Sequence, residues 1–100
     1  MKKIINGKKY DTETAESIAT YSNNYCYNDF NSLIETLFKK KTGEFFLYGQ
    51  GGPMTCYAEH YGNSRTSGEK IIPFTIEQAK IWVEEKANDK YEEIFGECEE

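Results

Sequence analysis

Two runs rich in aliphatic and aromatic residues, 32–39 and 44–48, flank the short segment Lys41-Thr42-Gly43. Such runs favour β-strands, and a glycine between them supplies the positive φ that a tight hairpin turn needs. Apolar residues fall on both faces of the predicted hairpin, Leu33, Leu37, Phe45 and Leu47 on one and Ile34, Phe38, Phe46 and Tyr48 on the other. We therefore expect this hairpin at the centre of a sheet that is at least partly covered on both sides.

Two further β-hairpins are predicted around this centre. Asn6-Gly7 separates residues 3–5 from residues 8–10, and this dipeptide favours a type I′ turn. After the glycine-rich break at 49–53, residues 54–61 alternate in polarity and are expected to form a strand that pairs with residues 69–72.

Helices are expected at both ends of the chain. Asp11 or Thr12 could cap a short N-terminal helix that ends near residue 21. Thr75 and Gln78 have the spacing of a capping box, and apolar residues recur at helical spacing after them, at Ile76, Ala79, Val83 and Ala87, with Trp82 beside them. A second short helix is expected from residue 88 or 89, with Tyr91, Ile94 and Phe95 buried, and Gly96 should end it.

These elements predict an α+β fold: an antiparallel sheet of about 4–5 strands packed against the short N-terminal helix and one or two C-terminal helices. The length of 100 residues suits one domain, with residues 97–100 as a frayed acidic tail. Three cysteines without a paired spacing, and no long apolar run, favour a reducing cytoplasm and no membrane partner. The oligomeric state is left open between a monomer and a small homo-oligomer.

The charge is concentrated at the C-terminal end. The second half of the chain holds eleven acidic residues against five basic ones, whereas the first half is nearly balanced. The candidate partner-binding carboxylates are Glu84, Glu85, Asp89, Glu92, Glu93 and Glu97. They can form a solvated outer face, or a decoy surface that occupies a basic nucleic-acid groove, because carboxylates on a helix face are spaced somewhat like phosphates.

No motif predicts catalysis, a cofactor or a metal site. Cys56 and His60 would lie about 13 Å apart on a strand, so Cys56 is expected to be a small buried residue and His60 a surface one. The glycines at 49–52 lack the Gly-Lys-Ser/Thr of a phosphate-binding loop. Lys39, Lys40 and Lys41 could touch a phosphate backbone, with tyrosines stacking on bases, but the net charge of −5 makes nucleic acid a poor partner.

Three segments carry a resemblance that runs through most of the chain: residues 2–16, residues 41–53, and residues 91–97. They resemble a group of small acidic proteins of Firmicutes that are carried on phages, plasmids and integrated elements. Small acidic proteins from such elements include anti-CRISPR proteins, which bind and block CRISPR effector nucleases. The resemblance implies a genetic setting and a fold, and it supplies no catalytic residues.

The function expected on these grounds is non-enzymatic: inhibition of a host defence nuclease, such as a Cas9-type effector, by protein–protein binding in the host cytoplasm. The acidic residues would be the primary contact, and no direct contact with nucleic acid is expected. A secondary contact surface is expected at Tyr48, Gln50, Met54 and Tyr57. The alternatives are a nucleic-acid-binding accessory protein that uses the basic hairpin tip and exposed tyrosines, or a small domain of unknown function.

Overall fold

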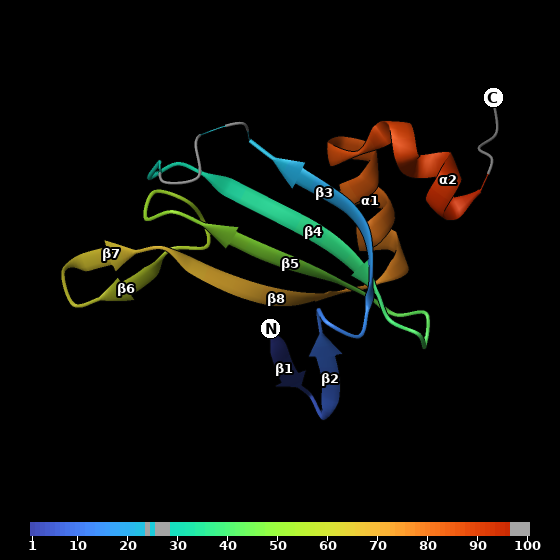
Figure 1. Cartoon of the computed structure of the whole chain (residues 1–100), viewed down its shortest axis with the longest axis horizontal. Helices are drawn as coiled ribbons and strands as arrows, with labels where there is room; N and C mark the ends of the chain where they lie inside the picture. Colours follow the sequence, from blue (N-terminus) through green and yellow to red (C-terminus); the bar gives the residue numbers. More distant parts are fainter. Residues whose placement is uncertain (24, 26–28, 97–100) are drawn as a thin grey trace.

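A four-stranded antiparallel sheet forms the centre of the computed structural model, which describes residues 1–23, 25 and 29–96 (Figure 1). Its strands lie in the order β3 (Glu16–Ser22), β4 (Leu33–Lys39), β5 (Phe45–Gly51) and β8 (Gly68–Phe74). The two central strands form the hairpin expected from the sequence, with Leu37 opposite Leu47 and Phe38 opposite Phe46. The α+β class and the central position of this hairpin are therefore confirmed.

Both faces of the sheet are covered at the end where β4 turns into β5. On one face, helix α1 (Ile76–Lys86) packs against the sheet through a core formed by Ala19, Leu37, Phe45, Leu47, Ala79, Trp82, Val83 and Ala87. On the other face a second core is formed by Tyr10, Phe38, Phe46 and Ile71. The molecule thus has three layers at this end: helices, sheet and an N-terminal hairpin.

The N-terminal hairpin consists of β1 (Lys2–Ile5) and β2 (Lys8–Asp11). Its turn has the conformation predicted from the sequence, with φ of +52° at Asn6 and +77° at Gly7. The Tyr10 ring fixes the hairpin to the sheet, because it packs edge-on against Phe46 with the ring centroids 5.5 Å apart.

The predicted N-terminal helix is wrong, because residues 16–22 form the edge strand β3. Asp11 does form the hydrogen bonds of a helix cap. Its side chain accepts a hydrogen bond from the Glu13 N–H at 2.9 Å, and the Asp11 carbonyl accepts one from the Ala15 N–H. The chain then turns once instead of continuing as a helix. Ile18, Thr20 and Tyr21 favour extended backbone, and pairing with β4 satisfies that preference.

The predicted strand at 54–61 is also wrong for most of its length. Two successive turns occupy this segment, with N–H groups of Thr55 and Ala58 bonded to the carbonyls of Gly52 and Thr55. Only β6 (Glu59–Tyr61) is extended, and it pairs locally with β7 (Ser64–Thr66), while β8 takes the place beside β5. Because the turns expose it, Cys56 lies on the surface, contrary to expectation.

The C-terminal helices follow the sequence prediction closely. α1 is followed by the 3₁₀ turn η1 (Asn88–Lys90) and by α2 (Tyr91–Phe95), which ends at Gly96 with φ of +95°. Tyr91, Ile94 and Phe95 are partly buried against the first core. Ile76 differs from expectation, since it is 50% exposed at the start of α1. No helix in the described part of the chain is long and apolar enough to cross a membrane.

Removal of the α1 cap should have a modest, local effect on stability. Thr75 Oγ1 accepts the Gln78 N–H at 3.2 Å, and Gln78 Oε1 accepts the Thr75 N–H at 2.8 Å. Thr75→Ala is expected to lower the free energy of unfolding by about 1 kcal/mol, because one N–H of the first turn loses its partner. Urea denaturation measures this change. Thr75→Ser, which keeps the hydroxyl, is the matched control, and an equal loss in both variants would contradict the role of the cap.

Candidate protein-binding surfaces

The carboxylates predicted to bind a partner are displayed on the two C-terminal helices and the turn between them. Five of them are exposed and together define the acidic helical face: Glu84, Glu85, Asp89, Glu92 and Glu93. Glu97 lies outside the described residues. The structure therefore places these five side chains where a protein partner could reach them.

The acidic helical face is not a ladder along one continuous helix. Ala87 closes α1 with φ of −146° and ψ of +47°, and the chain then passes through η1 before α2 begins. Figure 1 shows α1 and α2 as two separate coils rather than one rod. The acids are consequently divided between two short helices, and the regular 5–6 Å repeat of a single helix face holds only within each helix.

Two lysines on α1 lie beside aromatic rings of neighbouring elements. The Lys86 ammonium lies 4.5 Å from the centroid of the Tyr21 ring on β3, and Lys80 lies 5.8 Å from that of Phe95. Such cation–π contacts position the ammonium groups against the protein surface. The five carboxylates of the acidic helical face outnumber Lys80, Lys86 and Lys90, the three lysines of α1 and η1, so this face has a net negative charge.

The four residues of the predicted secondary surface do not form one patch. Tyr48 and Gln50 are half-buried on the sheet face opposite α1, and the Tyr48 hydroxyl donates to a Glu69 carboxylate oxygen. Met54 is 59% exposed in the turn after Pro53, whereas Tyr57 is only 2% exposed. Of the four, Met54 is the most exposed, and Gln50 lines a hollow of about 690 Å³ at the end of the sheet.

Tyr57 belongs instead to a polar cluster on the helix side of the sheet. The Tyr57 hydroxyl donates to one carboxylate oxygen of Glu35, and the Trp82 indole N–H donates to the other at 3.1 Å. Glu35 projects from β4 on the same face as Leu33 and Leu37. The carboxylate thereby joins the turn segment 52–58 and helix α1 to the central strand. Unlike the contact residues above, this cluster has a structural role.

The pKa values of Tyr57, Tyr61 and Glu44 are shifted, with clear causes. Burial, followed by the hydrogen bond to the Glu35 carboxylate, raises the pKa of the Tyr57 hydroxyl. The hydrogen bond to Glu59 likewise raises the pKa of Tyr61. The hydrogen bond from Lys8 lowers the pKa of Glu44, with Lys40 acting in the same direction. Burial is thus the main cause for Tyr57, whereas a hydrogen bond is the main cause for Tyr61 and Glu44.

Cys56 and His60 both lie on the surface. Cys56 lies in the turn segment, and His60 is exposed on β6, as expected for a surface residue. Within residues 1–23, 25 and 29–96, no three His, Cys, Asp or Glu side chains gather as a metal site would require. Cys26 and Cys98 lie outside the described residues.

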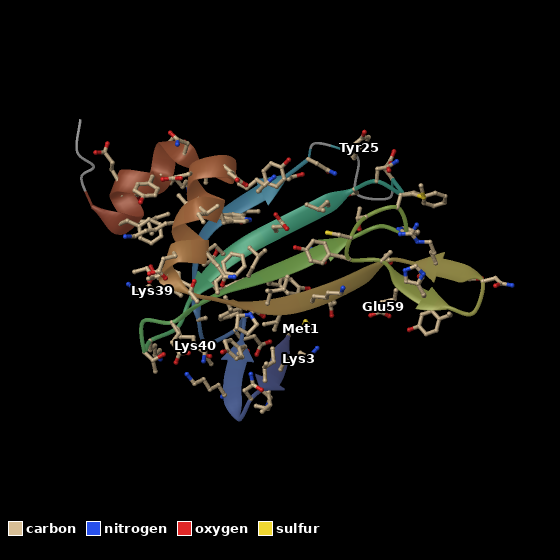
Figure 2. The ribbon with its side chains drawn as sticks, turned by 180° about the vertical axis from the view of Figure 1, so that it is seen from behind. Met1, Lys3, Tyr25, Lys39, Lys40 and Glu59 are labelled. Atoms are coloured by element: carbon tan, nitrogen blue, oxygen red, sulfur yellow. The ribbon has the colours of Figure 1, made fainter. Side chains whose placement is uncertain are left out.

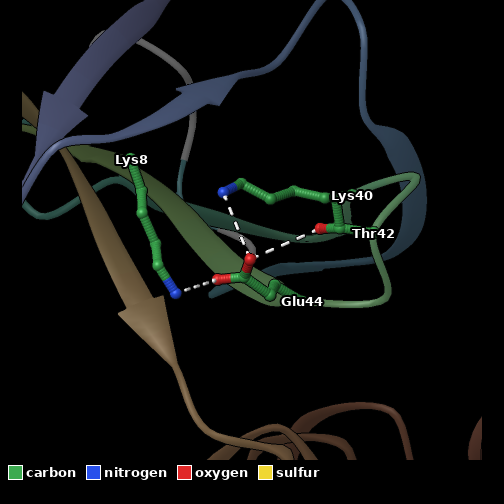
Figure 3. Close-up of polar contacts among 4 residues, drawn as sticks. All are labelled: Lys8, Lys40, Thr42 and Glu44. Carbon is green, nitrogen blue, oxygen red and sulfur yellow. Dashed lines mark hydrogen bonds and ion pairs between the residues drawn. The ribbon is translucent and has the colours of Figure 1, made fainter.

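The N-terminal hairpin and the β4–β5 turn meet around Glu44 (Figure 3). The Lys8 ammonium donates to Glu44 Oε2 at 3.3 Å, and the Lys40 ammonium lies 3.9 Å from Oε1, to which Thr42 also donates. Lys40 lies over the Tyr10 ring as well, 3.9 Å from its centroid. One carboxylate therefore holds two lysines that are 32 positions apart in the sequence.

Neither the Glu35 cluster nor the Glu44 cluster was predicted from the sequence. The sequence does contain a signal for Glu35. Strand alternation places this carboxylate between Leu33 and Leu37 on an otherwise apolar face, and a carboxylate there needs a hydrogen-bond donor. For the lysines at 8 and 40, the local sequence gives no such signal. Their proximity depends on the N-terminal hairpin folding back onto the sheet.

Comparisons with known proteins found no matching family model, no matching curated protein and no matching solved structure.

Proposed function

We propose that this chain is a non-enzymatic inhibitor of a host defence nuclease of the Cas9 type and that it acts by protein–protein binding. The acidic helical face occupies a groove of the nuclease that normally holds nucleic acid. Effectors of this class hold guide and target in a positively charged channel, so exposed carboxylates are complementary to it. The family resemblance supplies the genetic setting for this proposal.

The observation that carries the proposal is the segregation of charge between the two sides of the sheet. The acidic helical face is built by α1, η1 and α2 on one side, while six of the twelve basic residues belong to the N-terminal hairpin and the β4–β5 turn on the other. In Figure 2, Lys3 and Lys40 lie on the side of the N-terminal hairpin, whereas Lys39 lies beside the start of α1. A partner that approaches the helices therefore meets a predominantly negative surface.

The proposal is tested by binding followed by cleavage. Tagged protein is incubated with host lysate that contains an active CRISPR system, and the retained effector is assayed for cleavage of a target DNA. Retention together with loss of cleavage is expected. Because the contact is between exposed charges, inhibition should weaken as salt rises from about 50 to about 300 mM. Failure to retain any nuclease effector would contradict the proposal.

Charge reversal tests the surface assigned to the contact. We expect Glu85→Lys, Asp89→Lys and Glu93→Lys together to weaken inhibition by at least about a hundredfold, since three attractive contacts become repulsive. Titration of inhibitor against a fixed amount of nuclease measures this.

The matched control reverses three acids that lie outside the acidic helical face, Glu13, Glu16 and Glu77, with the same change in net charge. The control triple should inhibit nearly as well as the unmodified chain. Equal losses in the two triples would show that net charge, rather than the acidic helical face, governs inhibition.

A further inference from the structure

A depression of about 350 Å³ lies between the N-terminal hairpin and the β4–β5 turn. Lysines stand on both of its sides, Lys8 and Lys9 from β2 and Lys40 and Lys41 from the turn, and we call this depression the basic groove. The hydroxyl-bearing residues Thr14 and Thr42 also line it. The groove thus offers lysine ammonium groups from two separate hairpins.

The two carboxylates that line the basic groove already have partners. Asp11 accepts the backbone N–H of Glu13 at 2.9 Å, and Glu44 bridges Lys8 and Lys40. Lys9 and Lys41 are exposed. Glu44 therefore orients two of the lysines, and the two exposed lysines can engage an anion from outside.

The geometry points to a site for a phosphodiester backbone in the basic groove, and we propose that a single nucleic-acid strand binds there. Lysine ammonium groups on both sides of a narrow depression suit a linear polyanion that runs between them. An anionic membrane, in contrast, presents a plane, and lysines facing one another across a groove match a plane poorly.

The net charge of −5 does not oppose this proposal, because the charges are separated in space. Residues 1–16 and 39–44 carry seven lysines against four carboxylates, whereas the rest of the chain carries five basic residues against thirteen acidic ones. A polyanion responds to the local potential, which at the basic groove is positive, and the screening length at physiological salt is about 8 Å. The inference is independent of the nuclease proposal and replaces the expectation that nucleic acid makes no direct contact.

Fluorescence anisotropy with a labelled 20-nucleotide single-stranded DNA tests the site without any nuclease present. Binding is expected at about 20–50 mM salt, with a slope of log K against log salt of about −1.4 if Lys9 and Lys41 each displace a counterion. K9Q/K41Q should weaken binding by at least about tenfold and bring the slope close to zero. The control K70Q/K90Q removes the same charge elsewhere and should leave both unchanged.

Glu44→Gln is expected to raise the affinity for the oligonucleotide rather than lower it. It frees Lys8 and Lys40 and removes a negative charge from the basic groove, so binding should tighten by about threefold, the effect of one charge at about 7 Å in water. Glu77→Gln, with the same net change on α1, should have no effect. Circular dichroism melting confirms that each variant is folded.

The proposal is overturned if no oligonucleotide binds at 20 mM salt, or if K9Q/K41Q and K70Q/K90Q lose affinity equally. It is also overturned if phosphatidylserine vesicles bind while the oligonucleotide does not, since the groove would then recognise a lipid surface. Because the assay contains only protein and probe, its failure leaves the nuclease proposal intact, and failure of that proposal leaves this one intact.

Discussion

Gly49→Ala is expected to lower the free energy of unfolding by about 3 kcal/mol, because the added methyl group collides with a buried ring. A Cβ at this position would lie 2.0 Å from Cζ of Tyr57 and 2.2 Å from its hydroxyl oxygen. Tyr57 cannot simply swing away, since its hydroxyl is bonded to Glu35 and its side chain is 2% exposed. The ring and the turn segment 52–58 must shift together.

A double-mutant cycle with Tyr57→Ala isolates this steric cause. With the ring removed, Gly49→Ala should cost less than about 1 kcal/mol, so the two substitutions should be strongly non-additive. Chemical denaturation gives the four free energies. The single tryptophan, Trp82, provides a local readout, because its indole N–H shares the Glu35 carboxylate with Tyr57. If Gly49→Ala costs the same in both backgrounds, the loss comes from the backbone rather than from the Tyr57 contact.

The parts of the fold that the sequence predicted correctly depend on local chemistry. Asn6-Gly7 specifies its turn through two positive φ angles, and Thr75 with Gln78 specifies the start of α1 through two hydrogen bonds. The central hairpin was predictable because two runs that favour extended backbone flank Gly43, whose φ is +94°. In each case the atoms that decide the structure lie within a few residues of one another.

The errors arose where tertiary contacts outweighed a local signal. Asp11 makes the capping bonds of a helix start, yet the residues after it gain more from pairing with β4 than from a short isolated helix. The polarity of residues 54–58 alternates as in a strand. The segment nevertheless forms two turns, and the Tyr57 hydroxyl donates a hydrogen bond to Glu35 on β4. Neither partner is identifiable from the neighbouring sequence.

The candidate surfaces likewise combine features that the local sequence predicted with features that depend on tertiary contacts. The exposure of the acidic residues on the C-terminal helices followed from helical periodicity, whereas the break at Ala87 that divides them between two helices did not. The basic groove depends on a contact between Lys8 and Glu44, which the sequence did not predict, although it did single out the lysines at 39–41. For a protein of this size, the distribution of charge over the fold carries more functional information than its total.

Phe46→Ala is expected to have the largest effect of any substitution considered, a loss of about 4 kcal/mol. Phe46 is fully buried on β5, stacked on Phe38 with the ring centroids 5.2 Å apart and met edge-on by Tyr10. Its removal leaves a cavity between the sheet and the N-terminal hairpin, and the midpoint of thermal unfolding should fall by about 20 °C. Differential scanning calorimetry measures both quantities.

Phe30→Ala is the matched control, because this phenylalanine is 66% exposed and its loss should cost less than about 1 kcal/mol.

The same two variants also test whether the aromatic core fixes the geometry of the basic groove. Without Phe46 the hairpin loses the ring against which Tyr10 packs, so the contact between Lys8 and Glu44 should loosen even below the melting temperature. Phe46→Ala should therefore weaken oligonucleotide binding under folded conditions, and Phe30→Ala should not. Equal costs in the two variants would show that the hairpin is held to the sheet by something other than this aromatic core.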